Sequence, residues 1–166
     1  MYKMKKIKSA DMFPIVKEIL ESGSKAWITV TGMSMFPFLR EDEDCVELTH
    51  ATIDTINRGD IVLIQRYTGE YILHRVYKKE NNIFYMVGDA QRWIEGPLNP
   101  EQLIAVVEVV KRKNREISCN NKMWKLLVLV WLNIIPVRPV ILKVLRGIRK
   151  VFKGISNLKV VKVHGD

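Results

Sequence analysis

Between residues 26 and 112 the chain alternates short runs of β-branched and aromatic residues with turn-forming residues. Six such runs lie at residues 27–31, 45–48, 60–67, 71–79, 83–87 and 102–112. Asn, Gly, Asp and Pro gather between the runs, and residues 67–70 give the clearest hairpin signal. The sequence therefore predicts a mainly β protein whose body is a compact antiparallel barrel or folded sheet.

The regions on either side of this body follow a helical period instead. Apolar residues recur at helical spacing between residues 12 and 20, and Gly23 follows them as a stop signal. This pattern predicts an N-terminal helix within residues 1–25 that packs on the body. The predicted β domain covers residues 26–113, and residues 114–166 form a helical C-terminal tail.

Charge divides the chain at nearly the same place. Residues 1–110 hold 13 Lys and Arg against 16 Asp and Glu, whereas residues 111–166 hold 14 against 2. The whole chain carries a net charge of +9. A basic tail on a mildly acidic body predicts an anionic partner, either lipid headgroups or nucleic acid.

The tail is also amphipathic, with apolar residues at helical spacing from residue 140 to residue 155. The residues predicted on the opposite, basic face are Arg138, Lys143, Arg146, Arg149, Lys150 and Lys153. This combination is typical of a helix that lies in a membrane surface, although apolar stripes also cover a protein body or a partner subunit. The scarcity of acidic residues favours an anionic membrane surface. Nucleic acid is the least favoured partner, because no aromatic side chains alternate with the basic ones.

Neither end of the chain predicts a membrane span or a secretory signal. The longest apolar run, residues 126–137, is interrupted by Asn133 and is shorter than the ~18 residues that a span needs. No long apolar stretch follows the basic residues at the N-terminus. The two cysteines, Cys45 and Cys119, form neither a disulfide framework nor a metal-binding pair in sequence, and no cofactor is expected.

Two residues are suited to nucleophilic catalysis. Ser34 directly follows a predicted strand and precedes Pro37, so a rigid turn can present its hydroxyl, although most turn serines serve only the turn. His74 shares one face of a predicted strand with aliphatic residues, which is also the usual setting of a buried structural histidine. No lysine occurs between residues 26 and 77, so a base for Ser34 must be a histidine or a carboxylate. Among the histidines, His74 is the best placed.

Two carboxylates are available to orient the imidazole of His74. Asp89 follows a predicted strand within the Gly-Asp-Ala sequence of residues 88–90, and Glu95 lies six residues later. An ordinary turn at the end of a strand explains the Gly-Asp pair equally well.

Taken in order, these segments resemble the superfamily of type I signal peptidases and self-cleaving SOS repressors. Ser-Met-Phe-Pro at residues 34–37 is similar to its Ser-Met-x-Pro nucleophile box, and Arg-Gly-Asp-Ile-Val at residues 58–62 is similar to a family strand. Leu-His-Arg-Val at residues 73–76 resembles the box that holds lysine in bacterial signal peptidases and histidine in the archaeal and endoplasmic-reticulum type. Gly-Asp-Ala at residues 88–90 resembles the late Gly-Asp box, and the resemblance covers roughly residues 27–112.

The resemblance implies a serine endopeptidase in which Ser34 is the nucleophile, His74 the general base and an acyl-enzyme the intermediate. The third catalytic residue of the endoplasmic-reticulum type corresponds in position to Glu95, with Asp89 as the alternative. The backbone N–H of Ser34 would serve the oxyanion. Family members bind a peptide substrate in extended conformation as an added strand.

Two departures from the family pattern leave other interpretations open. Gly32 lacks the side chain that often donates to the oxyanion, and no N-terminal membrane anchor is found. We therefore expect an enzyme at the cytoplasmic face of a membrane, held by its tail, with the opposite topology as the alternative. The alternative function is a catalytically silent, membrane-associated module that binds peptides. A self-cleaving regulator would need a preceding DNA-binding domain, and residues 1–25 have room for only one helix.

Overall fold

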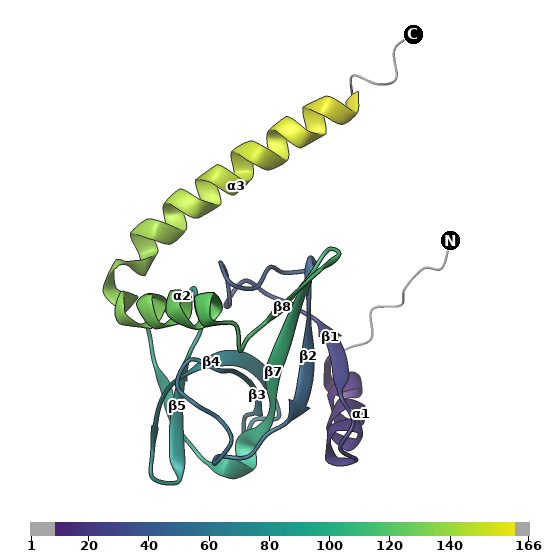
Figure 1. The fold of residues 1–166 in the computed structure, drawn as a ribbon, viewed down its shortest axis with the longest axis vertical. Coiled ribbons are helices and arrows are strands. Elements are labelled where there is room, and N and C mark those ends of the chain that lie inside the picture. The colour runs from purple at the N-terminus through teal and green to yellow at the C-terminus, as the bar shows by residue number, and fades with distance from the viewer. Residues whose placement is uncertain (1–8, 162–166) are drawn as a thin grey trace.

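A computed structural model describes the backbone of residues 9–161 and the side chains of residues 12–151 (Figure 1). The first elements are α1 Ser9–Glu21, β1 Ala26–Thr29, β2 Asp44–His50, β3 Ile61–Gln65, β4 Tyr71–Glu80 and β5 Ile83–Val87. They are followed by β6 Glu95–Leu98, the 3₁₀ turn η1 Pro100–Gln102, β7 Leu103–Arg112 and β8 Arg115–Ser118. The chain continues with α2 Lys122–Asn133, the 3₁₀ turn η2 Ile135–Val137 and α3 Arg138–Val161.

The strands form one antiparallel sheet in the order β1-β2-β7-β3-β4-β5-β6, and β8 pairs with β7. The sheet curls strongly but does not close, because β1 and β6 stand at opposite ends of the strand order (Figure 1). The mainly β prediction is thus confirmed as a folded sheet rather than a closed barrel. The hairpin predicted at residues 67–70 joins β3 to β4, and Gly69 there has a φ of +88°, which glycine adopts without strain.

Two strands were not predicted from the sequence. β6 contains Gly96 and Pro97, which indicate a turn, but this strand lies at the edge of the sheet, where proline removes no ladder hydrogen bond. β8 has mainly polar residues, and its pairing with β7 places Ile117 opposite Val110. The sheet therefore continues past residue 113.

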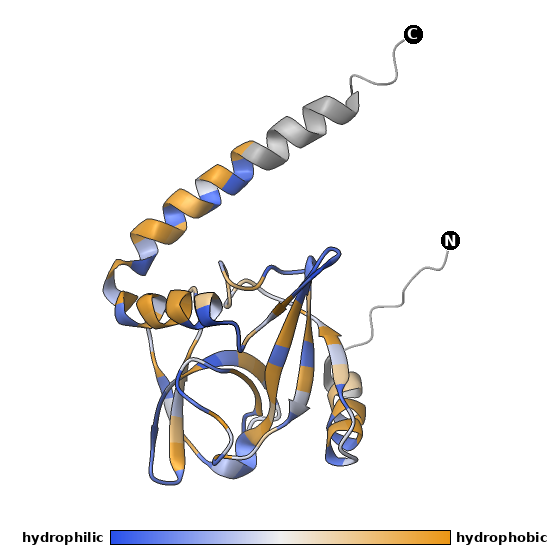
Figure 2. Cartoon of the chain, in the orientation of Figure 1, coloured by the Kyte–Doolittle hydropathy of each residue, from blue (hydrophilic) through white to orange (hydrophobic). Residues whose placement is uncertain are grey.

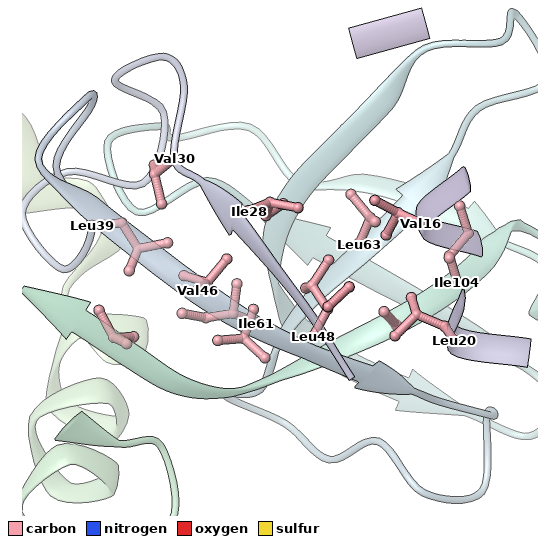
Figure 3. Close-up of a cluster of buried hydrophobic side chains, with 14 of the residues drawn as sticks. Val16, Leu20, Ile28, Val30, Leu39, Val46, Leu48, Ile61, Leu63 and Ile104 are labelled. Atoms are coloured by element: carbon pink, nitrogen blue, oxygen red, sulfur yellow. The ribbon is translucent and has the colours of Figure 1, made fainter. Parts of the chain in front are cut away.

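The largest buried cluster holds α1 against the sheet (Figure 3). Val16 and Leu20 of the helix pack with Ile28, Leu48 and Leu63 from β1, β2 and β3. A second cluster fills the other side of β3 and β4, where Val62 and Val76 are fully buried. Burial of these side chains is the main source of stability of the body.

The C-terminal helices begin with a well-formed cap. The side chain of Asn121 accepts hydrogen bonds from the backbone N–H groups of Met123 and Trp124, which starts α2. α2 then lies across the end of the sheet, and α3 leads away from the body (Figure 1). In the described residues no single helix has the length and hydropathy of a membrane span. Taken together, α2 and the first part of α3 are long and apolar enough, but the two helices are bent by 78° relative to each other.

Arg138 does not lie where the helical period predicts. The sequence places it on the exposed basic face of the tail, but its side chain is fully buried. It is the first residue of α3, directly after the bend, and the bend directs its side chain toward α2 and the body. Lys143, Arg146 and Lys150 are exposed as predicted, and the side chain of Lys153 lies outside the described residues.

Candidate active site

Ser34 lies in the turn that connects β1 to β2, and its side chain is half-buried. Gly32, two residues earlier, has a φ of +79°, a conformation that side chains rarely adopt. Its backbone N–H donates a 3.0 Å hydrogen bond to Oε1 of Glu41. Met35 and Phe36 anchor the turn in the interior, so the backbone on both sides of Ser34 is held in place.

The Gly-Asp box lies directly against Ser34. The backbone N–H of Ala90 donates a 2.7 Å hydrogen bond to the carbonyl oxygen of Ser34. A Cβ atom added to Gly88 would lie 2.9 Å from the same oxygen, so only glycine fits there without a shift. Two boxes that are distant in sequence thus form one surface.

His74 lies in the middle of β4, opposite Val62 of β3, and only 4% of it is exposed. Its Nδ1 atom is buried and has no hydrogen-bond partner among the described residues. Burial disfavours the charged imidazolium and lowers the pKa of His74 to about 4. The negative charge of Glu95 opposes this shift. His74 is therefore neutral at physiological pH.

No hydrogen bond joins the hydroxyl of Ser34 to the imidazole of His74 within the described part of the chain. The two residues are connected indirectly instead, by one backbone hydrogen bond and one side-chain ion pair. Ser34 is bound to the Gly-Asp box, and that box is bound to Arg75, the neighbour of His74 in β4. Hydrogen bonds between catalytic groups are often long or absent before substrate binds.

Asp89 is bound by Arg75 rather than by His74. Nε of Arg75 donates to Oδ1 at 2.9 Å and Nη2 donates to Oδ2 at 2.6 Å, and neither side chain has exposed surface. Nη1 of Arg75 also donates to the carbonyl of Gly59 at 2.7 Å. This one guanidinium therefore ties together three of the sequence boxes.

Glu95, in β6, is bound in the same way by Arg66. The two hydrogen bonds measure 2.6 and 2.7 Å, and both side chains are partly buried. Glu95 is the charged group that most strongly favours protonation of His74. It acts on the imidazole through charge, without a hydrogen bond to it in the structure, and the positive charge of its partner Arg66 acts in the opposite direction.

Sequence reasoning missed both arginines. Arg75 is the next residue after His74 in β4, so the period-two pattern of a strand predicts that its side chain points to the opposite face of the sheet. That pattern gives no sign that Arg75 has a buried carboxylate partner. Arg66 lies next to a predicted hairpin, where an exposed charge is the ordinary expectation. Each partner carboxylate is more than ten residues away along the chain, and local patterns do not report such pairs.

A separate cavity of about 620 Å³ lies between α2 and the sheet. Asp60, Cys119, Trp124 and Val128 contribute to its lining. None of the four predicted site residues lines it. Burial raises the pKa of the Cys119 thiol to about 11, so this cysteine is a poor nucleophile.

The sequence model of the Peptidase S24-like family matches residues 2–110. The chain belongs to the Peptidase S24-like family. This membership confirms the resemblance to the signal peptidase and SOS-repressor superfamily, and it identifies a peptidase-type fold. No match was found among curated proteins.

The S24-like match contains all four predicted site residues, Ser34, His74, Asp89 and Glu95. It ends at Val110, near the end of β7. β8, α2 and α3 lie beyond it, so their contacts with the site come from outside the matched family region.

Proposed function

We propose that this S24-like protein is a serine endopeptidase of the signal peptidase type, which cleaves a leader, a signal sequence or another extended peptide segment. Ser34 is the nucleophile and His74 the general base. The observation that carries this proposal is the state of His74: buried, neutral and with an Nδ1 atom that lacks a partner in the described structure. Buried polar atoms without partners are rare and concentrate at functional sites.

The chemistry follows the general scheme of acyl transfer. Oγ of Ser34 attacks the scissile carbonyl carbon while the imidazole of His74 takes the hydroxyl proton. The C–N bond then breaks, the imidazolium protonates the leaving amine, and the acyl group stays on Ser34 as an ester. Water, deprotonated by His74, hydrolyses this ester and restores the serine.

The backbone N–H of Ser34 is available to stabilise the oxyanion. In the described structure it donates no hydrogen bond, although its neighbours in the turn are bound to one another. Because Gly32 has no side chain to contribute, the backbone must supply this stabilisation. A single oxyanion donor contributes on the order of 10²–10³ to kcat.

The two carboxylates have different proposed roles. Glu95 favours the imidazolium that forms during the reaction, because it is the main negative charge acting on His74. Asp89 holds Arg75, and thereby the alignment of β4 with the Gly-Asp box, because both of its oxygens are occupied.

The end strand β1 offers a place for an extended substrate. β1 pairs only with β2, so its other edge has free backbone groups within the described sheet. The chain runs from this strand directly into the Ser34 turn. A peptide added to β1 would be led toward Ser34 by main-chain hydrogen bonds.

We also propose that the protein works at an anionic membrane surface, at its cytoplasmic face. Figure 2 shows apolar residues along α2 and α3, interrupted by polar ones. The exposed apolar side chains of these helices are Met123, Leu126, Leu127, Leu129, Val130, Val140, Val144, Ile148 and Val151. No acidic residue occurs between residues 117 and 151, and the basic residues there favour anionic lipid.

The decisive experiment compares protein N-termini by mass spectrometry in cells that carry the native chain, Ser34→Ala or the control Ser22→Ala. Ser22 is an exposed hydroxyl at the end of α1. We expect precursors to accumulate with Ser34→Ala alone. Identical N-termini in all three would contradict the peptidase proposal and favour the silent peptide-binding module.

A further inference from the structure

The helices beyond the family region bind the loop that carries the Gly-Asp box. Trp131 of α2 donates its indole N–H to the carbonyl of Asp89 at 3.0 Å. Arg138 of α3 donates Nη1 to the carbonyls of Gly88 and Gln91 at 3.2 and 3.3 Å. Residues 88–91 are here called the Gly-Asp loop. Three of its four backbone carbonyls therefore accept hydrogen bonds from side chains of the C-terminal helices.

The Gly-Asp loop passes this constraint to Ser34. Ala90, inside the loop, donates its backbone N–H to the carbonyl of Ser34 at 2.7 Å. From Arg138 to the Ser34 backbone there is thus a path of two hydrogen bonds and one short loop. The same helices also hold the far side of the nucleophile turn, because Phe36 packs in one buried cluster with Trp131 and Leu142.

Burial of the Arg138 side chain costs free energy that packing alone does not explain. Its guanidinium is fully buried, and no carboxylate forms an ion pair with it among the described residues. Its hydrogen-bond partners are all carbonyl oxygens, since Nε and Nη2 both donate to the carbonyl of Trp131 at 3.2 and 3.0 Å. The guanidinium also lies over the indole ring of Trp131, 5.3 Å from its centroid. An apolar side chain would fill this space without the desolvation cost of a cation. The planar guanidinium has several N–H donors in a fixed geometry, so it orients several carbonyl groups at once, which an apolar side chain does not do.

We propose that Arg138 is a positioning residue of the peptidase site, which acts through the Gly-Asp loop to hold the Ser34 backbone in its reactive orientation. The C-terminal helices then complete a site that the family region alone leaves open on one side. This inference rests on the proposed function. The contact holds the carbonyl of Ser34 directly, and through the Cα of the same residue it restricts the backbone N–H that would bind the oxyanion.

Arg138→Met in the full-length protein tests this role, with Arg146→Met as the matched control. Arg146 is on the same helix, is exposed and has no ion pair within the described region, so the control removes the same charge without the contact. The probe is an internally quenched peptide with small side chains next to the scissile bond. We expect kcat to fall by roughly 10- to 100-fold, the effect of a small misplacement of reacting groups. KM should stay within about threefold, because ground-state binding is not touched. An unchanged kcat in folded Arg138→Met would overturn the proposal.

Trp131→Phe keeps an aromatic ring in the buried cluster and removes the hydrogen bond to Asp89 together with part of the ring volume. It remains informative if Arg138→Met does not fold. The readout for all variants is amide hydrogen exchange at Ala90, which needs no activity. We expect exchange at least about tenfold faster in Trp131→Phe and in folded Arg138→Met than in Arg146→Met, because the loop opens locally. Failure of the native protein to cleave the peptide would count against the proposed function alone. Unchanged exchange at Ala90 in folded Arg138→Met would count against the positioning role of Arg138. If that variant does not fold, unchanged exchange in Trp131→Phe would count against a positioning role of the C-terminal helices.

Discussion

Arg75 and Asp89 form a two-point ion pair in which neither side chain has exposed surface. The pair joins β4, which carries His74, to the loop that is bound to Ser34. The relative position of His74 and Ser34 therefore depends on this ion pair. The guanidinium also donates a hydrogen bond to the carbonyl of Gly59. We therefore propose that the pair supports the site by aligning β4 with this loop.

Asp89→Asn should destabilise the protein by about 3–5 kcal/mol, because it leaves the Arg75 cation buried without its counter-ion. Urea unfolding monitored by fluorescence measures the change. The control is Glu80→Gln, which breaks an exposed pair with Lys78 and should cost less than about 1 kcal/mol. A direct catalytic role for Asp89 would instead appear as lost activity at nearly native stability.

Gly88→Ala should destabilise the protein by about 1–3 kcal/mol, the usual cost of overpacking. The added Cβ would lie 2.9 Å from the backbone oxygen of Ser34, which cannot move without disturbing the nucleophile turn. Gly147→Ala is the matched control, since nothing lies within 4 Å of a Cβ there and alanine favours a helix by about 0.5–1 kcal/mol. Thermal unfolding should show a lower melting temperature for Gly88→Ala and an equal or higher one for Gly147→Ala. Peptide cleavage should fall only for Gly88→Ala.

The strands of the body could be predicted because each is short, locally patterned and bounded by turn residues. β5 spans Ile83–Val87, as its run of apolar and aromatic residues indicates. β6 could not be predicted, because Gly96 and Pro97 indicate a turn. A strand that contains proline is expected only at the edge of a sheet, and the local sequence does not show that β6 lies there. Edge position is a property of the whole sheet rather than of the local sequence.

The candidate site could be predicted only in part, for a similar reason. Family boxes indicate Ser34 and His74, but the partners of the two carboxylates depend on which strands meet in the fold. The helical period predicts an exposed Arg138, whereas the residue is buried, because such a period carries no information about the 78° bend that precedes it. Long-range pairing and chain direction are therefore the two properties that local patterns omit.

Membrane binding should depend on the apolar side chains that α3 exposes. The double variant Val144→Asp with Ile148→Asp should weaken binding to phosphatidylglycerol-containing vesicles at least about tenfold, since each apolar side chain contributes roughly 1.5–3 kcal/mol when buried. Ile15→Asp with Ile19→Asp adds the same charges on exposed positions of α1 and should have little effect. Vesicle co-sedimentation at low and high salt measures binding. Equal loss in both double variants would show that net charge, rather than the α3 surface, controls it.

The buried imidazole of His74 should make the protein less stable in mild acid. Its pKa is about 4 in the folded protein against 6.5 ordinarily, so between these pH values the unfolded chain binds more protons. Stability is therefore unaffected above pH 6.5 and is lost as the pH falls toward 4, by about 3 kcal/mol in total at 1.36 kcal/mol per pKa unit. Urea unfolding from pH 4 to pH 7.5 measures this loss in the native chain, in His74→Gln and in the exposed control His50→Gln. The loss should persist in His50→Gln and be reduced in His74→Gln; the same slope in all three would mean that His74 is not the group that titrates.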